Sequence, residues 1–301
     1  MNYILETEGL SKNYKTKKAL DNVSIHVEQG AIYGLVGRNG AGKTTLMKII
    51  CGLIGKSAGS YSIFGKNGSD INYLKQRIGL LIESPGVFDE FDALTNLKIK
   101  CSLLGIRGNA EPERLLKMVG LEDTGKKKTG QFSLGMKQRL GIGMALAGKP
   151  DIVVLDEPIN GLDPQGIIEI RDMIRKLNKE NGTTFIISSH ILDELSKIAT
   201  KYGIINYGKL AEEILADELF SKCESRIELV TDNPSAATTV LEKIGFTQYK
   251  VMDEGRIYIY EQFDRTADIT LALAAQGINT LEILKKIESV EDYYMKLVGE
   301  T

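Results

Sequence analysis

Several residue types that would suggest other kinds of protein are scarce in this sequence. Its 301 residues include no tryptophan, two histidines and three cysteines. The cysteines, Cys51, Cys101 and Cys223, follow no metal-ligand spacing, so they predict neither a disulfide framework nor a cysteine–histidine metal site. We therefore expect idle or buried thiols, as in proteins of a reducing compartment.

Long hydrophobic runs and an excess of basic charge are also missing. No stretch approaches the roughly 18 consecutive apolar residues that a membrane-spanning helix requires, and the N-terminal segment lacks the apolar core of a signal peptide. The formal net charge of −2 disfavours broad nucleic-acid binding, because such proteins usually carry a basic excess. With 43% hydrophobic residues, the chain has ample material for packed cores. We expect a protein that is soluble or is held at a membrane by a partner.

Short apolar runs predict an α/β protein built around a parallel sheet. Residues 31–36, 152–155 and 183–188 are rich in apolar side chains, which is typical of strands buried on both faces of such a sheet. Between the last two runs, residues 164–180 form an amphipathic helical pattern, and Asp163 is a suitable cap before it. This strand–helix–strand order predicts parallel strands joined by crossover helices.

Three further regions complete the predicted organisation. Residues 2–30 predict two strands joined by a turn, and residues 84–149, with apolar positions every three or four residues, predict a mostly helical insertion. After about residue 217 the order becomes β-α-β-β-α-β, followed by an amphipathic helix, which matches the ferredoxin-like arrangement. We therefore expect one domain over residues 1–216 and a small α+β domain over residues 217–301.

A glycine-rich loop with a complete phosphate-binding pattern follows the first apolar run. It satisfies G-x-x-x-x-G-K-[ST] and comprises Gly37, Arg38, Asn39, Gly40, Ala41, Gly42, Lys43, Thr44 and Thr45. Glycines let the backbone wrap around phosphates, whose charge is stabilised by the amides and by the helix N-terminus. We expect Lys43 at the β- and γ-phosphates and the Thr44 hydroxyl at Mg²⁺. The complete pattern and its flanks disfavour the alternative of an ordinary glycine-rich turn.

An acidic pair, Asp156 and Glu157, ends the apolar run 152–155. Carboxylates at the carboxyl end of a buried parallel strand lie at the sheet edge where ligands bind. We expect Asp156 to hold Mg²⁺, through water, and Glu157 to polarise the attacking water. Alone, the pair would be an ordinary solvated strand end; together with the phosphate loop it predicts a catalytic pair.

With these motifs in place, residues 132–139, FSLGMKQR, resemble the LSGGQ signature of the ATP-binding cassette (ABC) ATPases, followed by K-Q-R. Ser133 and Gly135 agree with the signature, whereas Phe132, Leu134 and Met136 depart from it. The segment stands in the family's order, between the phosphate loop and the acidic pair.

Other pieces of the family pattern follow in register. Residues 160–163, NGLD, resemble the D-loop, and His190 resembles the switch histidine that senses the γ-phosphate. Tyr14 resembles the aromatic residue that stacks on adenine. An isolated histidine or tyrosine would more often be structural. The resemblance covers about residues 2–215 and implies the cassette fold, in which a parallel sheet is joined by an antiparallel β subdomain and a helical subdomain.

The resemblance further implies an ATPase that uses ATP and Mg²⁺ and works with protein partners. Cassettes of this family pair head to tail, so Ser133 and Gly135 would contact the γ-phosphate bound by a second cassette. That cassette could be a copy of this chain or a paralogue. A separate membrane permease would provide the transport path, which places this chain at the cytoplasmic face of a bacterial plasma membrane.

The permease would dock on the helical insertion around residues 85–120. Phe88, Phe91 and Leu94 are candidates for the docking groove, although they serve equally well as core residues of the insertion.

One departure from the family pattern is informative. The family usually has a glutamine in the loop before the helical insertion, and here Glu83 occupies that place. A carboxylate there would add negative charge near the metal and could bind it. This glutamate, the FSLGMKQRLG segment and the C-terminal extension resemble the bacterial subfamily that exports bacitracin and lantibiotic peptides for self-protection or resistance.

A second function class is a soluble ABC ATPase acting on ribosomes or nucleic acid. Such proteins usually carry two cassettes or a long inserted coiled coil, and this chain shows one phosphate loop and no such insertion. The C-terminal domain could bind a regulatory ligand or buttress a dimer. Because no cluster of converging polar residues marks it, the buttress is favoured.

Overall fold

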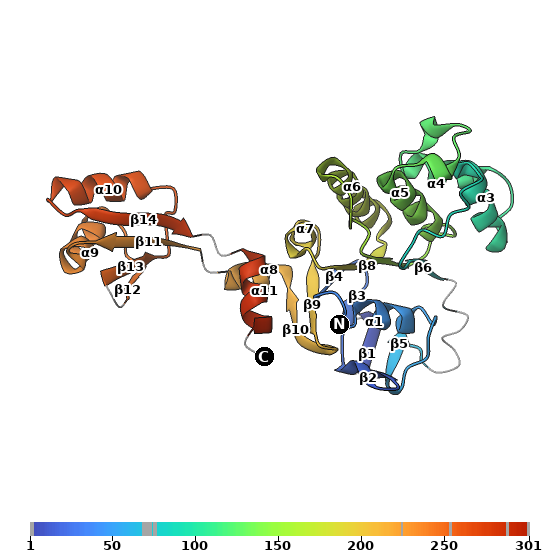
Figure 1. Ribbon diagram of the computed structural model, residues 1–301, viewed down its shortest axis with the longest axis horizontal. Coiled ribbons are helices and arrows are strands. Elements are labelled where there is room, and N and C mark those ends of the chain that lie inside the picture. The colour runs from blue at the N-terminus through green and yellow to red at the C-terminus, as the bar shows by residue number, and fades with distance from the viewer. Residues whose placement is uncertain are drawn as a thin grey trace. The chain divides into compact units, whose positions relative to one another are not determined.

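The protein consists of two compact units, Met1–Ala216 and Asp217–Thr301 (Figure 1). The computed structural model describes residues 3–67, 74, 77–223, 225–252, 255–286 and 289–299. Each unit has its own sheet and its own apolar core.

A six-stranded sheet forms the centre of the first unit. Its order is β10-β9-β4-β8-β7-β6, and all neighbouring strands are parallel except β9 and β10, which form an antiparallel hairpin. The strands are β4 (Ile32–Val36), β6 (Ile78–Leu81), β7 (Ile152–Asp156), β8 (Thr184–Ser189), β9 (Lys201–Asn206) and β10 (Lys209–Leu215). Every residue of β4, β7 and β8 is buried, which confirms the three strands predicted from apolar runs.

Two helices flank the strands that bear the predicted site. Helix α1 (Lys43–Ile50) follows β4, and α6 (Pro164–Asn181) connects β7 to β8. As the sequence predicts, the Asp163 side chain caps α6, accepting a hydrogen bond from the Gly166 amide. Pro164 occupies the first turn of this helix, where its missing N–H is tolerated. One stripe of α6, Ile170, Ile174 and Leu177, is buried.

An antiparallel sheet forms the N-terminal part of this unit. It contains β1 (Tyr3–Tyr14), β2 (Lys17–Val23), β3 (His26–Glu28) and β5 (Ala58–Ile63), with β1 paired to the other three. The prediction of two strands in residues 2–30 was wrong, because β2 and β3 are separate strands. The Thr7 hydroxyl donates to Val23 O and accepts from Ile25 N, which holds the break between them. Such a tertiary contact leaves no trace in hydrophobic periodicity.

The predicted helical insertion is confirmed. It contains α3 (Ala93–Leu103), α4 (Ala110–Met118) and α5 (Leu134–Ala145), with 3-10 turns η3 (Glu122–Thr124) and η4 (Thr129–Gln131) between α4 and α5. Leu97, Cys101 and Leu115 are buried among these helices. A short helix, α7 (Leu192–Ser196), follows β8. Among the residues that the structure describes, no helix is long and apolar enough to cross a bilayer.

The second unit has the predicted β-α-β-β-α-β order. Helix α8 (Ala216–Lys222), which the sequence analysis did not predict, leads into it from the last residue of the first unit. The elements that follow are β11 (Arg226–Thr231), α9 (Pro234–Lys243), β12 (Tyr249–Val251), β13 (Arg256–Ile259), α10 (Thr266–Ala275), β14 (Thr280–Lys286) and α11 (Val290–Gly299). The sheet order is β12-β13-β11-β14 and every pairing is antiparallel. Strand β13 therefore lies between the parallel strands β11 and β12, which is the split βαβ, ferredoxin-like arrangement. Alternate residues of β11 and β13 form its core with α9 and α10.

Candidate active site

The glycine-rich loop connects β4 to α1 at the carboxyl end of the parallel strands. Gly40 and Gly42 have φ of 82° and 114°, a region that other residues rarely adopt. A Cβ on Gly37 would lie 2.4 Å from Ile205 O, so this position also requires glycine. The loop can thus bring its backbone amides, and the N-terminal turn of α1, close to a ligand bound in front of it.

A cavity of about 270 Å³ opens in front of this loop. Most of the residues predicted to bind nucleotide line it, together with Lys17 and Ala19: they are Tyr14, Arg38, Asn39, Gly40, Gly42, Lys43, Thr44, Thr45 and Glu157. The Tyr14 side chain is 46% exposed, so its ring is available for stacking at the rim. The structure therefore assembles the predicted phosphate loop, the adenine-stacking candidate and one acidic residue around a single cavity.

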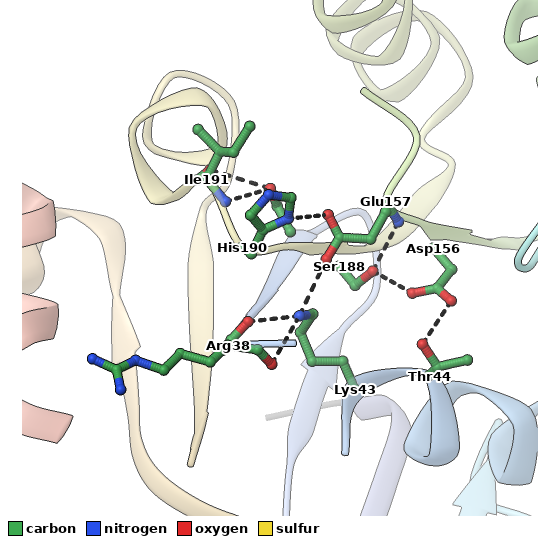
Figure 2. A network of polar contacts seen from close by, with 10 residues as sticks. Arg38, Lys43, Thr44, Asp156, Glu157, Ser188, His190 and Ile191 are labelled. Atoms are coloured by element: carbon green, nitrogen blue, oxygen red, sulfur yellow. Dashed lines mark hydrogen bonds and ion pairs between the residues drawn. The ribbon is translucent and has the colours of Figure 1, made fainter. Parts of the chain in front are cut away.

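Lys43 is buried, with 5% of its side chain exposed. Its ammonium donates to Gly37 O at 2.6 Å and lies 3.1 Å from Glu157 Oε1, within ion-pair distance (Figure 2). A buried ammonium without such partners would carry a large desolvation cost. The cation therefore lies at the centre of the loop, directly beside the acidic residue that the sequence assigns to catalysis.

Asp156 holds two hydroxyl groups. Thr44 Oγ1 donates to Asp156 Oδ2 at 2.8 Å, and Ser188 Oγ donates to Asp156 Oδ1 at 2.5 Å (Figure 2). A carboxylate and a hydroxyl on converging elements are the hard oxygen ligands that Mg²⁺ prefers, so the predicted pair of metal ligands fits that ion.

Glu157 is held in a strained backbone conformation. Its φ of 48° is unusual for a residue other than glycine. The amide of Glu157 donates to Ser188 Oγ at 2.9 Å, and Glu157 Oε2 lies 2.8 Å from His190 Nδ1. Strain of this kind persists where the surroundings over-determine it and is frequent at active sites. The carboxylate is thus fixed between Lys43 and His190.

Ser188 is the site residue that the sequence analysis missed. It is fully buried in β8, directly opposite Asp156 of β7, and its hydroxyl contacts both acidic residues. The sequence signal for it was a serine pair at the end of an otherwise apolar strand next to His190. Sequence alone does not show which of the two serines points toward the acidic pair.

Three predicted site residues lie apart from this cluster. Ser133 and Gly135 stand at the exposed N-terminal turn of α5, where Ser133 Oγ accepts from Met136 N at 3.3 Å. Glu83, the third of these residues, is 65% exposed, and its carboxylate pairs with Lys48. The other two predicted metal ligands, Thr44 and Asp156, contact each other.

The aromatic pair of the helical insertion lies at its surface. Phe88 and Phe91 are 49% and 44% exposed, and their ring centroids are 6.1 Å apart. Leu94 is partly buried on α3. The two phenylalanines are therefore not core residues, and their rings are accessible on this face of the insertion.

The thiols have no part in the site. Cys51 and Cys101 are buried, and burial raises the pKa of the Cys51 thiol to about 12. Within the described parts of the chain, no group of three or more His, Cys, Asp or Glu side chains is arranged to hold a metal ion by itself.

Similarity to known proteins shows the family to which this chain belongs. The ABC transporter family profile matches residues 20–160. The bacitracin transport ATP-binding protein BcrA of Bacillus licheniformis is 40% identical over 99% of this chain and 98% of its own length. The chain belongs to the ABC transporter ATP-binding proteins. The lantibiotic transport ATP-binding protein SrtF of Streptococcus pyogenes is 42% identical over 70% of this chain and 90% of its own length.

A solved ABC cassette shares the fold of the first unit. The dimeric, post-hydrolysis structure of the cassette MJ0796 bound to ADP and Pi matches with a TM-score of 0.64 at 25% identity, covering 70% of this chain and 98% of that one. As a member of the family, this ABC subunit binds and hydrolyses ATP. ABC ATP-binding subunits dimerise and work with a separate membrane permease.

Proposed function

We propose that this ABC subunit powers the export of a peptide antibiotic, or of a similar amphiphile, through a separate permease at the cytoplasmic face of a bacterial plasma membrane. The similarity to the bacitracin transport protein BcrA supports this substrate class, because it extends over both units of the chain and not over the cassette alone. The similarity to the lantibiotic transport protein SrtF points to the same class.

The observation that carries the proposed chemistry is the line of contacts from Lys43 through Glu157 to His190. Lys43, in the phosphate loop, is placed to neutralise the β- and γ-phosphates of ATP. Glu157 then lies next to the γ-phosphorus, where its carboxylate would orient and polarise the attacking water. His190 would hold that carboxylate and contact the γ-phosphate. Catalysis of this kind is mostly positioning and charge stabilisation.

Mg²⁺ fits the oxygen ligands of the site. Thr44 and Asp156 would hold the ion, Asp156 through water, and Glu83 is a further candidate ligand if its loop moves toward them. When bound, the ion would neutralise the negative charge that develops on the phosphates. Ser188 would keep Asp156 in place by its hydrogen bond to Oδ1.

A second cassette, most simply a second copy of this chain, would complete each site. Ser133 and Gly135 do not line the cavity of their own chain; they stand at the N-terminus of α5, where Ser133 is exposed and Gly135 is partly buried. Backbone amides at a helix N-terminus bind anions, so these residues are suited to the γ-phosphate held by a partner. Phe88 and Phe91 provide an accessible aromatic surface on which the permease would dock.

The test is a resistance assay with an inactive variant. The chain is expressed with its permease in a sensitive host, and the minimal inhibitory concentrations of bacitracin and of a lantibiotic are measured. We expect a rise for at least one peptide with the unsubstituted chain and none with Glu157→Gln at equal abundance. Unchanged sensitivity to both, or co-sedimentation of the chain with ribosomes in place of the permease, would contradict the proposal.

A further inference from the structure

Lys48 is not part of any motif, yet it contacts a proposed metal ligand. Its ammonium lies 2.5 Å from Glu83 Oε1, and the two side chains are 26% and 65% exposed. Lys48 follows Thr44 by four residues on α1, so both side chains lie on the same face, one helical turn apart. The ion pair therefore holds the Glu83 carboxylate at a side chain that leaves α1 one turn beyond Thr44, which binds Asp156.

The backbone at Glu83 is strained. Its φ is 67°, and the amide of Ser84 donates to Ile82 O at 2.9 Å, which closes a three-residue γ-turn centred on Glu83. A γ-turn with positive φ is rare and strained for a residue with a side chain. Such conformations are energetically costly and are concentrated at active sites, ligand clamps and switch regions. Release of the Lys48 contact would free this turn to relax.

The turn also lies between the central sheet and the helical insertion. It follows β6, whose neighbour β7 ends in Asp156, and it leads into the helical insertion that carries Phe88 and Phe91. Glu83 therefore stands in the chain between the sheet edge that bears the proposed metal site and the surface proposed for the permease.

We propose that Lys48 is a positioning residue for Glu83: it holds the carboxylate in a resting place one helical turn from the Thr44–Asp156 site and competes there with Mg²⁺. This inference rests on the proposed magnesium site. Glu83 exchanges between the ammonium and the ion, and the strained turn relaxes in the exchange. The lysine thus lowers the apparent affinity of the site for the metal.

The test measures metal binding, not turnover. Mn²⁺ is titrated as a probe, by electron paramagnetic resonance, into the full chain with a non-hydrolysable ATP analogue. Lys48→Met should tighten Mn²⁺ binding by about two- to fivefold, the range expected for a partly exposed ion pair. In a Glu83→Gln background the same substitution should leave Mn²⁺ binding within a factor of about 1.5.

The double variant separates this role from a simple charge effect. Loss of any nearby cation would tighten metal binding, so equal tightening in the Glu83 and Glu83→Gln backgrounds would overturn the proposal. Unchanged or weaker binding in Lys48→Met would also overturn it. Lys197→Met is the matched control, because Lys197 contacts Glu194 at the same 2.5 Å and lines no part of the nucleotide cavity. If the unsubstituted chain binds no metal–nucleotide, the proposed site itself fails, and this inference with it.

Discussion

The two units of the chain place their polar residues differently. In the first unit, parallel strands end at one edge of the sheet, so Asp156 and Ser188 meet there although they are 32 residues apart. In the second unit, neighbouring strands run in opposite directions and their ends alternate. One of its charged pairs lies along a single strand: Arg226 contacts Glu228 at 2.6 Å. The parallel sheet gathers distant residues into one site, whereas charges of the antiparallel sheet form pairs within one strand, as Arg226–Glu228, or between adjacent strands, as Lys286–Glu228.

The largest effect that this comparison predicts is on catalysis. Glu157→Gln should lower ATP turnover by about 10² to 10⁴, because it removes the carboxylate proposed to polarise the water, while ATP binding remains. Glu228→Gln is the matched control: this acid is also mostly buried beside a cation, but in the second unit. Its turnover should equal that of the unsubstituted chain. Steady-state phosphate release measures both, and similar losses in the two variants would refute the distinction.

A core substitution in the second unit should lower the stability of that unit and leave ATP binding unchanged. Leu229 is fully buried in the core of the second unit, so Leu229→Ala should lower the free energy of unfolding of that unit by about 2 to 5 kcal/mol. ATP affinity should not change, because the described residues that line the nucleotide cavity all belong to the first unit. Thermal unfolding and ATP titration provide the two readouts. A parallel loss of ATP affinity would show that the site depends on the second unit.

The substitution Ser188→Ala tests the role of Ser188, the site residue that the sequence analysis missed. It leaves the Glu157 amide without its hydrogen-bond acceptor and Asp156 without one donor, at a cost of about 1 to 3 kcal/mol in a buried site. We expect turnover to fall by roughly tenfold or more with little change in ATP affinity. The pattern is checked by comparing kcat and KM with those of Ser189→Ala, whose hydroxyl donates to Ile191 O and accepts from Ile191 N. Equal effects of the two substitutions would remove the special role of Ser188.

The smallest effect concerns the thiols and should not touch activity. Burial raises the Cys51 pKa to about 12, so very little of this thiol is ionised at pH 8, and thiolate is the reactive form. Cys223, in the second unit, is partly exposed. Iodoacetamide should therefore label Cys223 well before Cys51, as followed by peptide mass spectrometry with Cys223→Ser as the control. Faster labelling of Cys51 would contradict the burial described for the first unit.

Much of the first unit could be predicted because its motifs are local in sequence. The phosphate loop, the acidic pair and His190 each follow an apolar strand, so their meeting at one sheet edge follows from a parallel sheet. The contacts that were missed are tertiary. The hydroxyl of Thr7 divides β2 from β3, Ser188 reaches across from the neighbouring strand, and Lys48 reaches Glu83 from a separate helix.

The second unit could be predicted by a different route. It carries no motif, but short strand-like segments such as RIELV and RIYIYE, interspersed with two segments of helical pattern, were sufficient to give its order of elements. The pairing of β13 between β11 and β12 matches the arrangement predicted from that order. Its function is not predicted in this way, because a fold does not specify a site.

The most direct measurement is the ATP affinity of the purified chain, with and without Mg²⁺, beside that of Lys43→Ala. The buried Lys43 ammonium is proposed to bind the phosphates, and a charge-assisted hydrogen bond contributes about 1.5 to 3 kcal/mol. We predict tighter binding with Mg²⁺ and a loss of roughly 10- to 150-fold in the variant. Equal affinity of the two proteins, with no influence of Mg²⁺, would contradict the assignment of this loop as the nucleotide site.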